Sequence, residues 1–401
     1  MSHFAVFGSH PRLSLAEFHA TEPNMPEPQL FGSAAVFESD DWNGGLLNEK
    51  LGGTVKLGDI IGSFANDTFS PADLIEALPR QPKGSFDFGC TIYGGSTAQK
   101  TRFKKFALEL KKEFKARNLS SRWVTGKDGE EIAPAAIAKL HLTTEGFDFN
   151  LFVSGNDIHV GLTTQVQDAD AWSERDYGRP ARSEDKGMLP PKLARMMVNL
   201  VGPGKKTILD PFCGSGTVLM EAALATDAEK LIGSDLDPAQ VADTKENTEW
   251  LKEMNILTSM DAMRCTAFVA DARKLGLKLD ENSIDAVVSE GFLGPALRGG
   301  EPLSFLQKNT KEISLLWSNT LKEIYPLLTD DARLVCIWPS FKTDHGMARV
   351  DLEEELGALG YSLVDPFDGW DSVAKGPLLY HRVGQRVMRR IVLLDKIKKT
   401  A

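Results

Sequence analysis

The sequence has few cysteines. Of its 401 residues only four are cysteine: Cys90, Cys213, Cys265 and Cys336. They lie far apart, without a Cys-x-x-Cys pair or a neighbouring histidine cluster. Structural zinc sites and disulfide frameworks depend on closely spaced ligands or paired cysteines. The sequence therefore predicts no metal site, no disulfides and reduced thiols.

Long apolar runs and an excess of basic residues are also absent. No apolar run approaches the roughly 20 residues that cross a membrane, and residues 1–7 lack the basic and apolar regions of a signal peptide. We therefore expect a cytoplasmic protein. The net charge of −10 excludes a protein coated in basic residues. Any nucleic-acid contact must come from basic residues gathered locally.

Residues 207–224 form the most informative stretch. A short apolar strand (207–210) leads into a turn containing Gly214 and Gly216, and a helix begins at Thr217. This layout is typical of a nucleotide-type cofactor site at the carboxyl end of a strand, where glycines let backbone N–H groups approach a ligand. Asp210, just before the turn, would repel a pyrophosphate but suits a cofactor with an ammonium and a sulfonium. The stretch therefore indicates S-adenosylmethionine.

Acidic residues follow the next two strands as well. Asp235 ends a strand about twenty residues after the turn, where an acid binds ribose hydroxyls. Asp237 is the alternative, although it also suits the N-cap of the following helix. Asp271 ends the third strand and is placed to accept a hydrogen bond from the adenine amino group. In a parallel α/β sheet these strand ends would meet in one crevice, beside a fourth strand at 285–289.

The octapeptide Asp210-Pro-Phe-Cys-Gly-Ser-Gly-Thr217 resembles motif I of the amino-methyltransferases that act on exocyclic nitrogens of nucleobases. Ser289-Glu-Gly-Phe292 occupies the place of their (Asp/Asn/Ser)-Pro-Pro-(Tyr/Phe) motif, with Glu-Gly in place of the prolines and hence a more flexible loop expected. The resemblance implies that the following residues bind the cofactor: Asp210, Phe212, Gly214, Gly216, Asp235, Asp271 and Ser289.

The same motif supplies the candidate catalytic residues, Ser289, Glu290 and Phe292. The Ser289 hydroxyl and the Glu290 carbonyl, with the Glu290 carboxylate as a further group, would accept hydrogen bonds from the amine as positive charge develops. Phe292 would stack on a flipped-out base, an interaction worth about 1–3 kcal/mol.

The first half of the chain contains a strongly basic helix after residue 96. One face carries Phe103, Phe106, Leu110 and Phe114 at helical spacing, and the other face is basic. Its candidate RNA-binding residues are Lys104, Lys105, Lys111, Lys112, Lys115 and Arg117. An ordinary solvated helix face is the alternative interpretation. Strands are expected at 86–93, 139–144, 147–153 and 157–163.

The N-terminal segments and the linker extend the resemblance over more of the chain. Residues 8–17, 51–56 and 86–94, with the linker 172–180 and the segment 187–200, are similar to THUMP-containing tRNA guanosine N2-methyltransferases. That family implies a ferredoxin-like α+β subdomain (1–84), a THUMP-like RNA-binding domain (85–170) and a Rossmann-like class I methyltransferase domain (171–401). In the last, residues 171–200 would form the linker and first helix, ahead of a seven-stranded, mostly parallel sheet.

The sequence therefore predicts an S-adenosylmethionine-dependent methyltransferase of guanine N2 in tRNA, with or without a small activating protein partner. One alternative is a DNA adenine or cytosine amino-methyltransferase, favoured by Ser289. Another is a non-catalytic RNA-binding protein that retains the cofactor pocket. In the expected closing hairpin at 378–394, several polar and basic side chains are candidate phosphate contacts or charged edge-strand residues: Arg382, Gln385, Arg386, Arg389 and Arg390.

Overall fold

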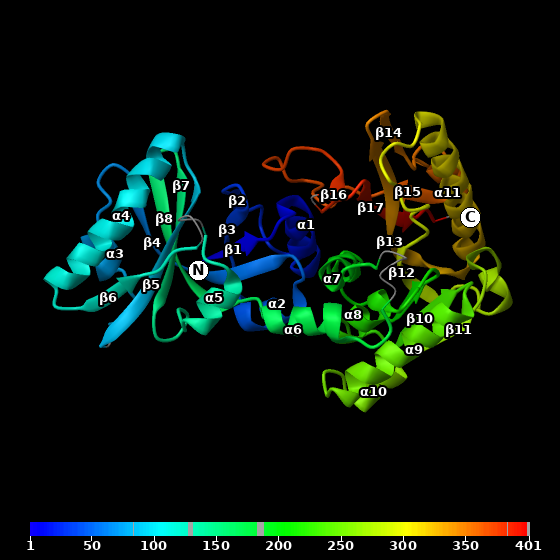
Figure 1. The fold of residues 1–401 in the computed structure, drawn as a ribbon, viewed down its shortest axis with the longest axis horizontal. Coiled ribbons are helices and arrows are strands. Elements are labelled where there is room, and N and C mark those ends of the chain that lie inside the picture. The colour runs from blue at the N-terminus through cyan, green and yellow to red at the C-terminus, as the bar shows by residue number, and fades with distance from the viewer. Residues whose placement is uncertain (83, 127–130, 183–187, 383, 399–401) are drawn as a thin grey trace. The chain divides into compact units, whose positions relative to one another are not determined.

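The structure, a computed structural model, describes residues 1–82, 84–126, 131–182, 188–382 and 384–398, without the side chain of Lys104. It divides into two compact units (Figure 1). Unit 1 comprises Met1–Ser14, Glu22–Trp172 and Trp370–Val373, and unit 2 comprises Leu15–Thr21, Ser173–Gly369 and Ala374–Ala401. Within the described residues, no helix is both long and apolar enough to cross a membrane.

Unit 1 is built on one sheet, which has eight strands within the described residues, in the order β2-β3-β1-β4-β8-β7-β5-β6. The strands are β1 Ser2–Phe7, β2 Gln29–Leu30, β3 Ala34–Glu38, β4 Thr54–Ala65, β5 Ser85–Gly94, β6 Ser120–Trp123, β7 Phe147–Ser154 and β8 Asp157–Val166. The helices are α1 Pro11–Thr21, whose second half belongs to unit 2, α2 Gly44–Lys50, α3 Pro71–Glu76, α4 Thr97–Ala116 and α5 Pro134–Lys139. Because β4 pairs with β8, the boundary predicted near residue 84 falls inside a continuous sheet.

Three of the four strands expected between residues 86 and 163 are confirmed as β5, β7 and β8. The prediction of a strand at 139–144 is wrong. Helix α5 ends at Lys139, His141 has a φ of +51°, and the Leu142 N–H bonds back to the Ile137 carbonyl. These contacts close the helix in a turn, so the alternation of leucine with histidine does not mark a strand here.

Unit 2 contains the predicted Rossmann-like sheet. Its main path runs β11-β10-β9-β12-β13-β17-β15, and β14 and β16 pair with β13 and β17, so the described residues form nine strands rather than seven. The strands are β9 Thr207–Asp210, β10 Lys230–Asp235, β11 Cys265–Val269, β12 Ile284–Glu290, β13 Leu328–Thr343, β14 Gly346–Arg349, β15 Tyr361–Leu363, β16 Leu378–Tyr380 and β17 Val387–Lys396. The first five on the path are parallel and β17 is antiparallel to β13. Counted from β9 the parallel order is 3-2-1-4-5, which places a topological switch point between β9 and β12.

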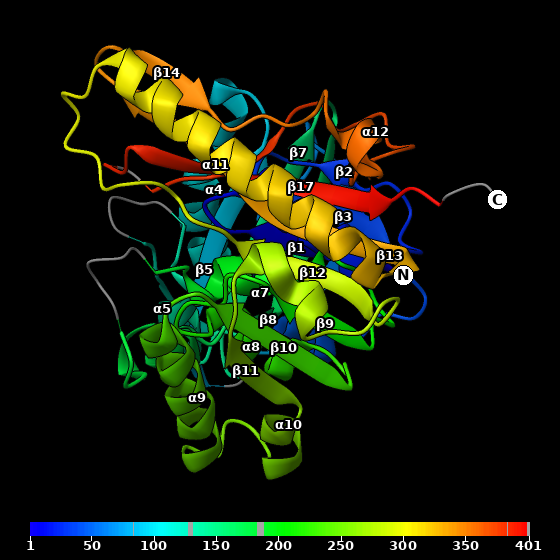
Figure 2. The same cartoon turned by 90° about the vertical axis from the view of Figure 1, so that its right-hand side faces the viewer.

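The remaining helices belong to unit 2, apart from the first four residues of α6. They are α6 Ala169–Ser173, which begins in unit 1, α7 Pro191–Asn199, α8 Thr217–Ala225, α9 Pro238–Glu253, α10 Ser259–Met263, α11 Leu303–Ile324 and α12 Leu356–Leu359. Figure 2 shows α11 running across one face of the sheet. Its Ile313, Trp317 and Leu321 are buried in a core shared with β12, β13 and β17. Burial of this apolar face holds the carboxyl ends of β9 and β12 in register.

Candidate functional site

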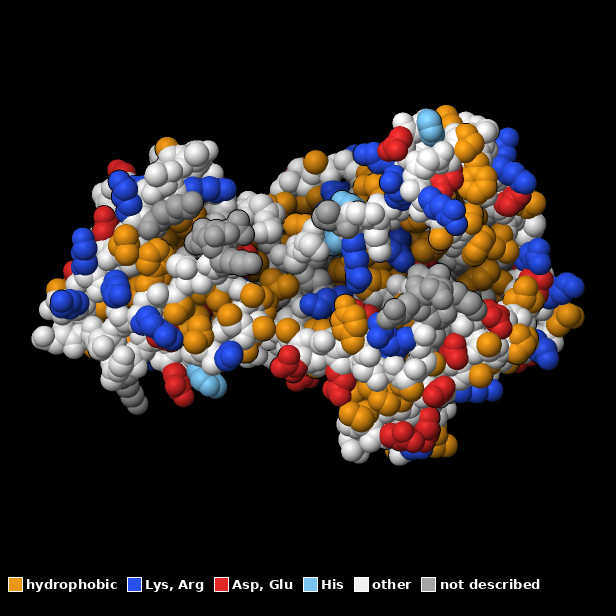
Figure 3. Space-filling view, in the orientation of Figure 1, with side chains coloured by type: hydrophobic (Ala, Val, Ile, Leu, Met, Phe, Trp, Pro, Cys, Tyr) orange, Lys and Arg blue, Asp and Glu red, His pale blue; other side chains and the backbone are white. Residues whose placement is uncertain are grey.

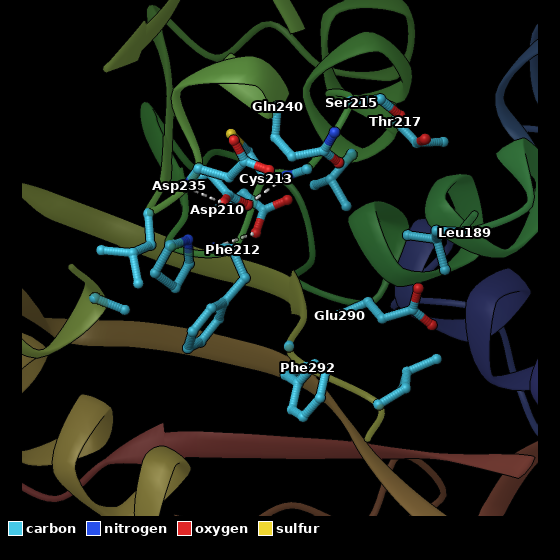
Figure 4. Close-up of a pocket in the computed structure, with 18 of the residues that line it drawn as sticks. Leu189, Asp210, Phe212, Cys213, Ser215, Thr217, Asp235, Gln240, Glu290 and Phe292 are labelled. Atoms are coloured by element: carbon cyan, nitrogen blue, oxygen red, sulfur yellow. Dashed lines mark hydrogen bonds between the residues drawn. The ribbon is translucent and has the colours of Figure 1, made fainter. Parts of the chain in front are cut away.

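A pocket of about 430 Å³ opens at the carboxyl ends of β9, β10 and β12. Five acidic residues line it, namely Asp210, Asp235, Asp237, Asp271 and Glu290; Asp210, Asp235 and Glu290 are labelled in Figure 4. The predicted convergence of Asp210, Asp235 and Asp271 in one crevice is therefore confirmed. Their roles toward a ligand stay predictions. A pocket of this volume matches those that bind cofactors and other small molecules.

Asp210 is buried at the end of β9. Its Oδ1 accepts hydrogen bonds from the Ser289 hydroxyl (2.6 Å) and the Phe212 amide (3.1 Å). Burial raises the pKa of Asp210 to about 7, against the effect of these two bonds, and the nearby charges of Asp235 and Glu290 raise it further. Asp210 is thus poised to become ionised when a cation enters the pocket.

Asp235 joins the glycine turn to β10. It accepts hydrogen bonds from the Gly214 amide (3.0 Å) and the Asp237 amide (2.9 Å). The Asp237 side chain accepts from the Ala239 amide (2.9 Å) and caps α9. The N-cap role predicted for Asp237 is therefore confirmed. Asp235 and Asp237 both line the pocket, and which of them binds ribose hydroxyls stays a prediction.

Asp271 lies two residues beyond the end of β11 and is held by Arg273. The Arg273 guanidinium donates two hydrogen bonds to its carboxylate (2.9 and 2.7 Å). These bonds lower the pKa of Asp271 to about 2, so the group is ionised at neutral pH. An adenine amino group that binds Asp271 would have to share this carboxylate with Arg273.

The two glycines of the turn serve different purposes. Both have positive φ, +52° at Gly214 and +85° at Gly216. A Cβ on Gly216 would lie 2.8 Å from Thr244 Cγ2 in α9, whereas one on Gly214 would meet nothing closer than Gln240 Oε1 at 3.6 Å. Helix packing thus also requires a glycine at 216, and the approach of a ligand to both glycines stays a prediction.

Ser289 and Glu290 occupy different environments at the end of β12. Ser289 is 0% exposed, donates its hydroxyl hydrogen bond to Asp210 and is not among the residues that line the pocket. Glu290 does line the pocket. In this structure the Ser289 side chain therefore supports Asp210 and does not line the pocket, which does not favour the substrate contact predicted for it.

Glu290 is paired with Arg389, which the sequence analysis named as a candidate phosphate contact. Arg389 Nε, on β17, donates to Glu290 Oε1 (2.5 Å), and Arg389 is only 5% exposed. Burial raises the pKa of Glu290, and the Arg389 charge opposes that rise. The proposed phosphate contact is thus corrected, because Arg389 is buried beside the pocket. Its separation of 99 residues from Glu290 hid this pairing from sequence analysis.

The loop after β12 departs from the family pattern for a packing reason. A Cβ on Gly291 would lie 2.8 Å from the buried Trp317 ring of α11, which also packs edge-on against Phe212. A side chain at this position would thus meet the indole, and the expected flexibility of the loop stays a prediction. Phe292 lines the pocket with 58% of its surface exposed, so its ring is accessible for stacking.

The predicted basic surface of α4 is present in unit 1. The buried face carries the four predicted apolar residues, and Lys105, Lys111, Lys112 and Lys115 are exposed. Figure 3 shows basic side chains spread over the region of α4. Arg117 is paired with Glu113 (3.0 Å) and Glu76 (3.7 Å), and the side chain of Lys104 lies outside the described residues. The four lysines and Arg117 are therefore exposed, with Arg117 partly neutralised by its two glutamates, and their RNA contacts stay a prediction.

Comparison with known proteins agrees with this geometry. Residues 179–291 match the model of the UPF0020 family, described as RMKL-like, methyltransferase domain. The chain is 40% identical over 105 residues to the tRNA (guanine(10)-N2)-dimethyltransferase of Methanothermobacter thermautotrophicus, covering 26% of this chain and 27% of that protein. It is 28% identical over 228 residues to the enzyme of the same name from Methanocaldococcus jannaschii, covering 54% and 61%. The matches thus span less than two thirds of these relatives.

A solved structure supports the fold. The crystal structure of TrmN from Thermus thermophilus superimposes with a TM-score of 0.53 at 16% identity, covering 99% of this chain and 100% of that one. Together with the family match, this likeness shows that the chain contains an RMKL-like methyltransferase domain with the class I methyltransferase fold, as predicted.

Proposed function

We propose that this protein is an S-adenosylmethionine-dependent methyltransferase that modifies the exocyclic N2 of a guanine in tRNA. The observation that carries the proposal is the pocket lined by Asp210, Asp235, Asp271 and Glu290 at the switch point of the sheet. The names of the curated relatives support both the reaction and the substrate.

The pocket residues fit the cofactor. Asp210 offers a buried carboxyl to the ammonium, Asp235 lies where ribose hydroxyls need an acceptor, and Asp271 is the acid beyond the third strand. The Gly214 amide is held by Asp235, and the space around Gly214 stays open. When bound, S-adenosylmethionine supplies an electrophilic methyl group on its sulfonium.

Glu290 favours guanine over adenine as the target base. The Watson–Crick edge of guanine presents two adjacent donors, N1–H and the N2 amino group, and a carboxylate can accept from both. Adenine presents a donor beside the N1 acceptor, which a carboxylate repels. With Glu290 fixed by Arg389, the residue can hold the guanine amine in line for attack and stabilise its developing positive charge.

Phe292 and unit 1 would supply the RNA contacts. The exposed Phe292 ring can stack on the flipped base. The four exposed lysines of α4 present positive charge on one rigid element, which attracts a polyanion and releases its counterions. We assign unit 1 the tRNA-binding role of the ferredoxin-like and THUMP-like domains, and we place the enzyme in the cytoplasm.

The structure removes the main support for a DNA enzyme. That alternative depended on Ser289 facing the substrate, and Ser289 is buried against Asp210. A non-catalytic RNA-binding protein stays the alternative that activity measurements must address.

The test is methyl transfer from labelled S-adenosylmethionine to total tRNA and to duplex DNA, followed by mass spectrometry of the nucleosides. We expect N2-methylated guanosine from tRNA alone. Glu290→Gln should lower kcat by at least about 100-fold, because the amide repels one of the two guanine donors and loses the charge. Glu353→Gln is the matched control, since Glu353 pairs with Arg390, next to Arg389 on β17, outside this pocket. Full activity of Glu290→Gln would contradict the role of Glu290, and no transfer by the unmodified protein would contradict the proposed function.

A further inference from the structure

The loop that carries Phe292 joins β12 to α11 and comprises residues 291–302. All of these residues are described, and none belongs to a helix or strand. Glycines stand at positions 291, 294, 299 and 300. At the first three a Cβ would crowd a side chain from elsewhere in unit 2, whereas at Gly300 it would meet no described residue within 4 Å. The backbone of the loop therefore rests on neighbouring side chains at three points.

The contact at Gly299 is made by Arg386, directly before β17. A Cβ on Gly299 would collide with the central carbon and both terminal nitrogens of the Arg386 guanidinium, so the guanidinium lies against the peptide backbone here. Gly299 also has a φ of +107°, which residues with a side chain rarely adopt. This position thus requires a glycine for two reasons, the conformation and the contact with Arg386.

Glu301 closes a turn of the loop near the same guanidinium. Its carboxylate accepts hydrogen bonds from the Arg298 amide (2.5 Å) and the Gly299 amide (2.7 Å). The bond from the Arg298 amide lowers the pKa of Glu301 most, and the Arg386 charge lowers it further. Arg386 therefore acts on the loop both by packing against Gly299 and through its charge.

The backbone of Arg386 is fixed to the sheet. Its carbonyl accepts a hydrogen bond from the Lys342 amide (3.0 Å) near the end of β13, and the next residue, Val387, pairs with Phe341. The Phe341 ring in turn lies 3.2 Å from the place of a Cβ on Gly294. Side chains of β13 and of the residue before β17 thus support both halves of the loop.

We infer that Arg386 is a positioning residue, which holds the loop 291–302 against the sheet and so places the Phe292 ring at the pocket. The inference rests on the stacking role proposed for Phe292. Phe292 lines the pocket (Figure 4) with 58% of its surface exposed, so its position depends on the loop backbone and not on a surrounding core. A misplacement of about 1 Å at a substrate-positioning residue can lower the rate about 100-fold.

Contact with an RNA phosphate is the other role open to Arg386. Its side chain is partly buried, and its guanidinium lies against Gly299. The Glu301 carboxylate, whose pKa this guanidinium lowers, would repel a phosphate that approached the same place. The contacts of Arg386 therefore favour positioning over phosphate binding.

Hydrogen–deuterium exchange tests the contact without the need for activity. In Arg386→Met, the amides of Arg298 and Gly299, which bond to Glu301, should exchange about 10-fold faster than in the unmodified protein. Arg333→Met removes an arginine that pairs with Asp395 (2.8 Å) and is the control, which should leave exchange in the loop unchanged. Unchanged exchange in Arg386→Met would refute the contact.

A double-mutant cycle on methyl transfer to tRNA tests whether Arg386 acts through Phe292. Phe292→Ala and Arg386→Met should each lower kcat/KM by about 10- to 100-fold. In the double variant the loss should stay within about threefold of the larger single loss, because the loop then has no ring to position. Losses that multiply, or a lower salt dependence of tRNA binding in Arg386→Met, would overturn the inference in favour of an independent phosphate contact.

The two adjacent glycines provide a matched pair of variants. Gly299→Ala, with a Cβ against the guanidinium, should lower kcat/KM about 10-fold. Gly300→Ala, at a residue without positive φ or close neighbours in the described chain, should leave it unchanged, and equal effects of the two would count against the inference.

Calorimetry with S-adenosylhomocysteine separates a misplaced loop from a misfolded unit. Its affinity should stay within about threefold in every variant, since a positioning role concerns the target base and not the cofactor. If Arg386→Met no longer binds it, the two glycine variants decide the matter. No methyl transfer by the unmodified protein would contradict the proposed function, whereas the exchange measurement would still decide whether Arg386 holds the loop.

Discussion

The buried carboxyl of Asp210 makes the stability of unit 2 depend on pH in a predictable direction. Its pKa is raised from 3.8 to about 7 by burial. The folded protein therefore keeps a proton that the unfolded chain loses, and this contribution to stability is lost as pH rises through 7. At about 1.4 kcal/mol per pH unit, the free energy of unfolding lost with rising pH is about 4 kcal/mol in total. About 2–3 kcal/mol of this loss falls between pH 5 and pH 8.

Asp210→Asn removes this titration and nearly preserves the shape of the residue. The asparagine oxygen can still accept the bonds from Ser289 and Phe212. The free energy of unfolding of the variant, minus that of the unmodified protein, should therefore rise by about 2–3 kcal/mol between pH 5 and pH 8. The measurement is urea unfolding without cofactor, followed by tryptophan fluorescence. A difference that stays constant over this range would refute the reasoning, because it would mean that Asp210 is ionised in the folded protein.

Two further predictions concern the turn and α4. Gly216→Ala should destabilise unit 2 by about 2–4 kcal/mol, because the contact of its Cβ with Thr244 adds to the strain of a positive φ. Gly214→Ala should cost only about 1 kcal/mol, because its Cβ meets no close neighbour. Equal losses of unfolding free energy in urea would contradict the packing argument. Replacing Lys111 and Lys112 by glutamine should weaken tRNA binding and lower the slope of log Kd against log salt by about 0.7–0.9 per lysine. The control pair Lys230 and Lys278, exposed residues of unit 2, should leave filter-binding isotherms unchanged, and equal effects of both pairs would argue against a specific role for α4.

Local sequence patterns predicted those parts of the site that lie close together in the chain. The strand, turn and helix around Gly214 and the capping role of Asp237 follow from short-range backbone geometry, and the structure confirms both. Strand ends could be predicted to converge because parallel strands in one sheet share an edge. The strand expected at 139–144 failed since its alternation is also compatible with the turn around His141.

The contacts that depend on distant segments could not be predicted. Glu290 meets Arg389 and Gly291 meets Trp317 only after β17 and α11 have packed against the sheet. No local signal marks such partners, because each lies many residues away from its contact. For the same reason no local pattern indicated that β4 and β8 pair and so join the first two predicted domains in one sheet.

The positions of Ser289 and Glu290 on β12 explain why comparison with the family motif predicted a substrate contact for the Ser289 side chain. Successive residues of a strand point to opposite faces, so Ser289 and Glu290 cannot both face the pocket. β12 continues to Glu290, and the pocket begins with that residue. Glu290 thus supplies an acid at the end of β12, and Gly291 follows it where the Trp317 ring occupies the space that a side chain would need. We therefore propose substrate contact for Glu290, and support of Asp210 for Ser289.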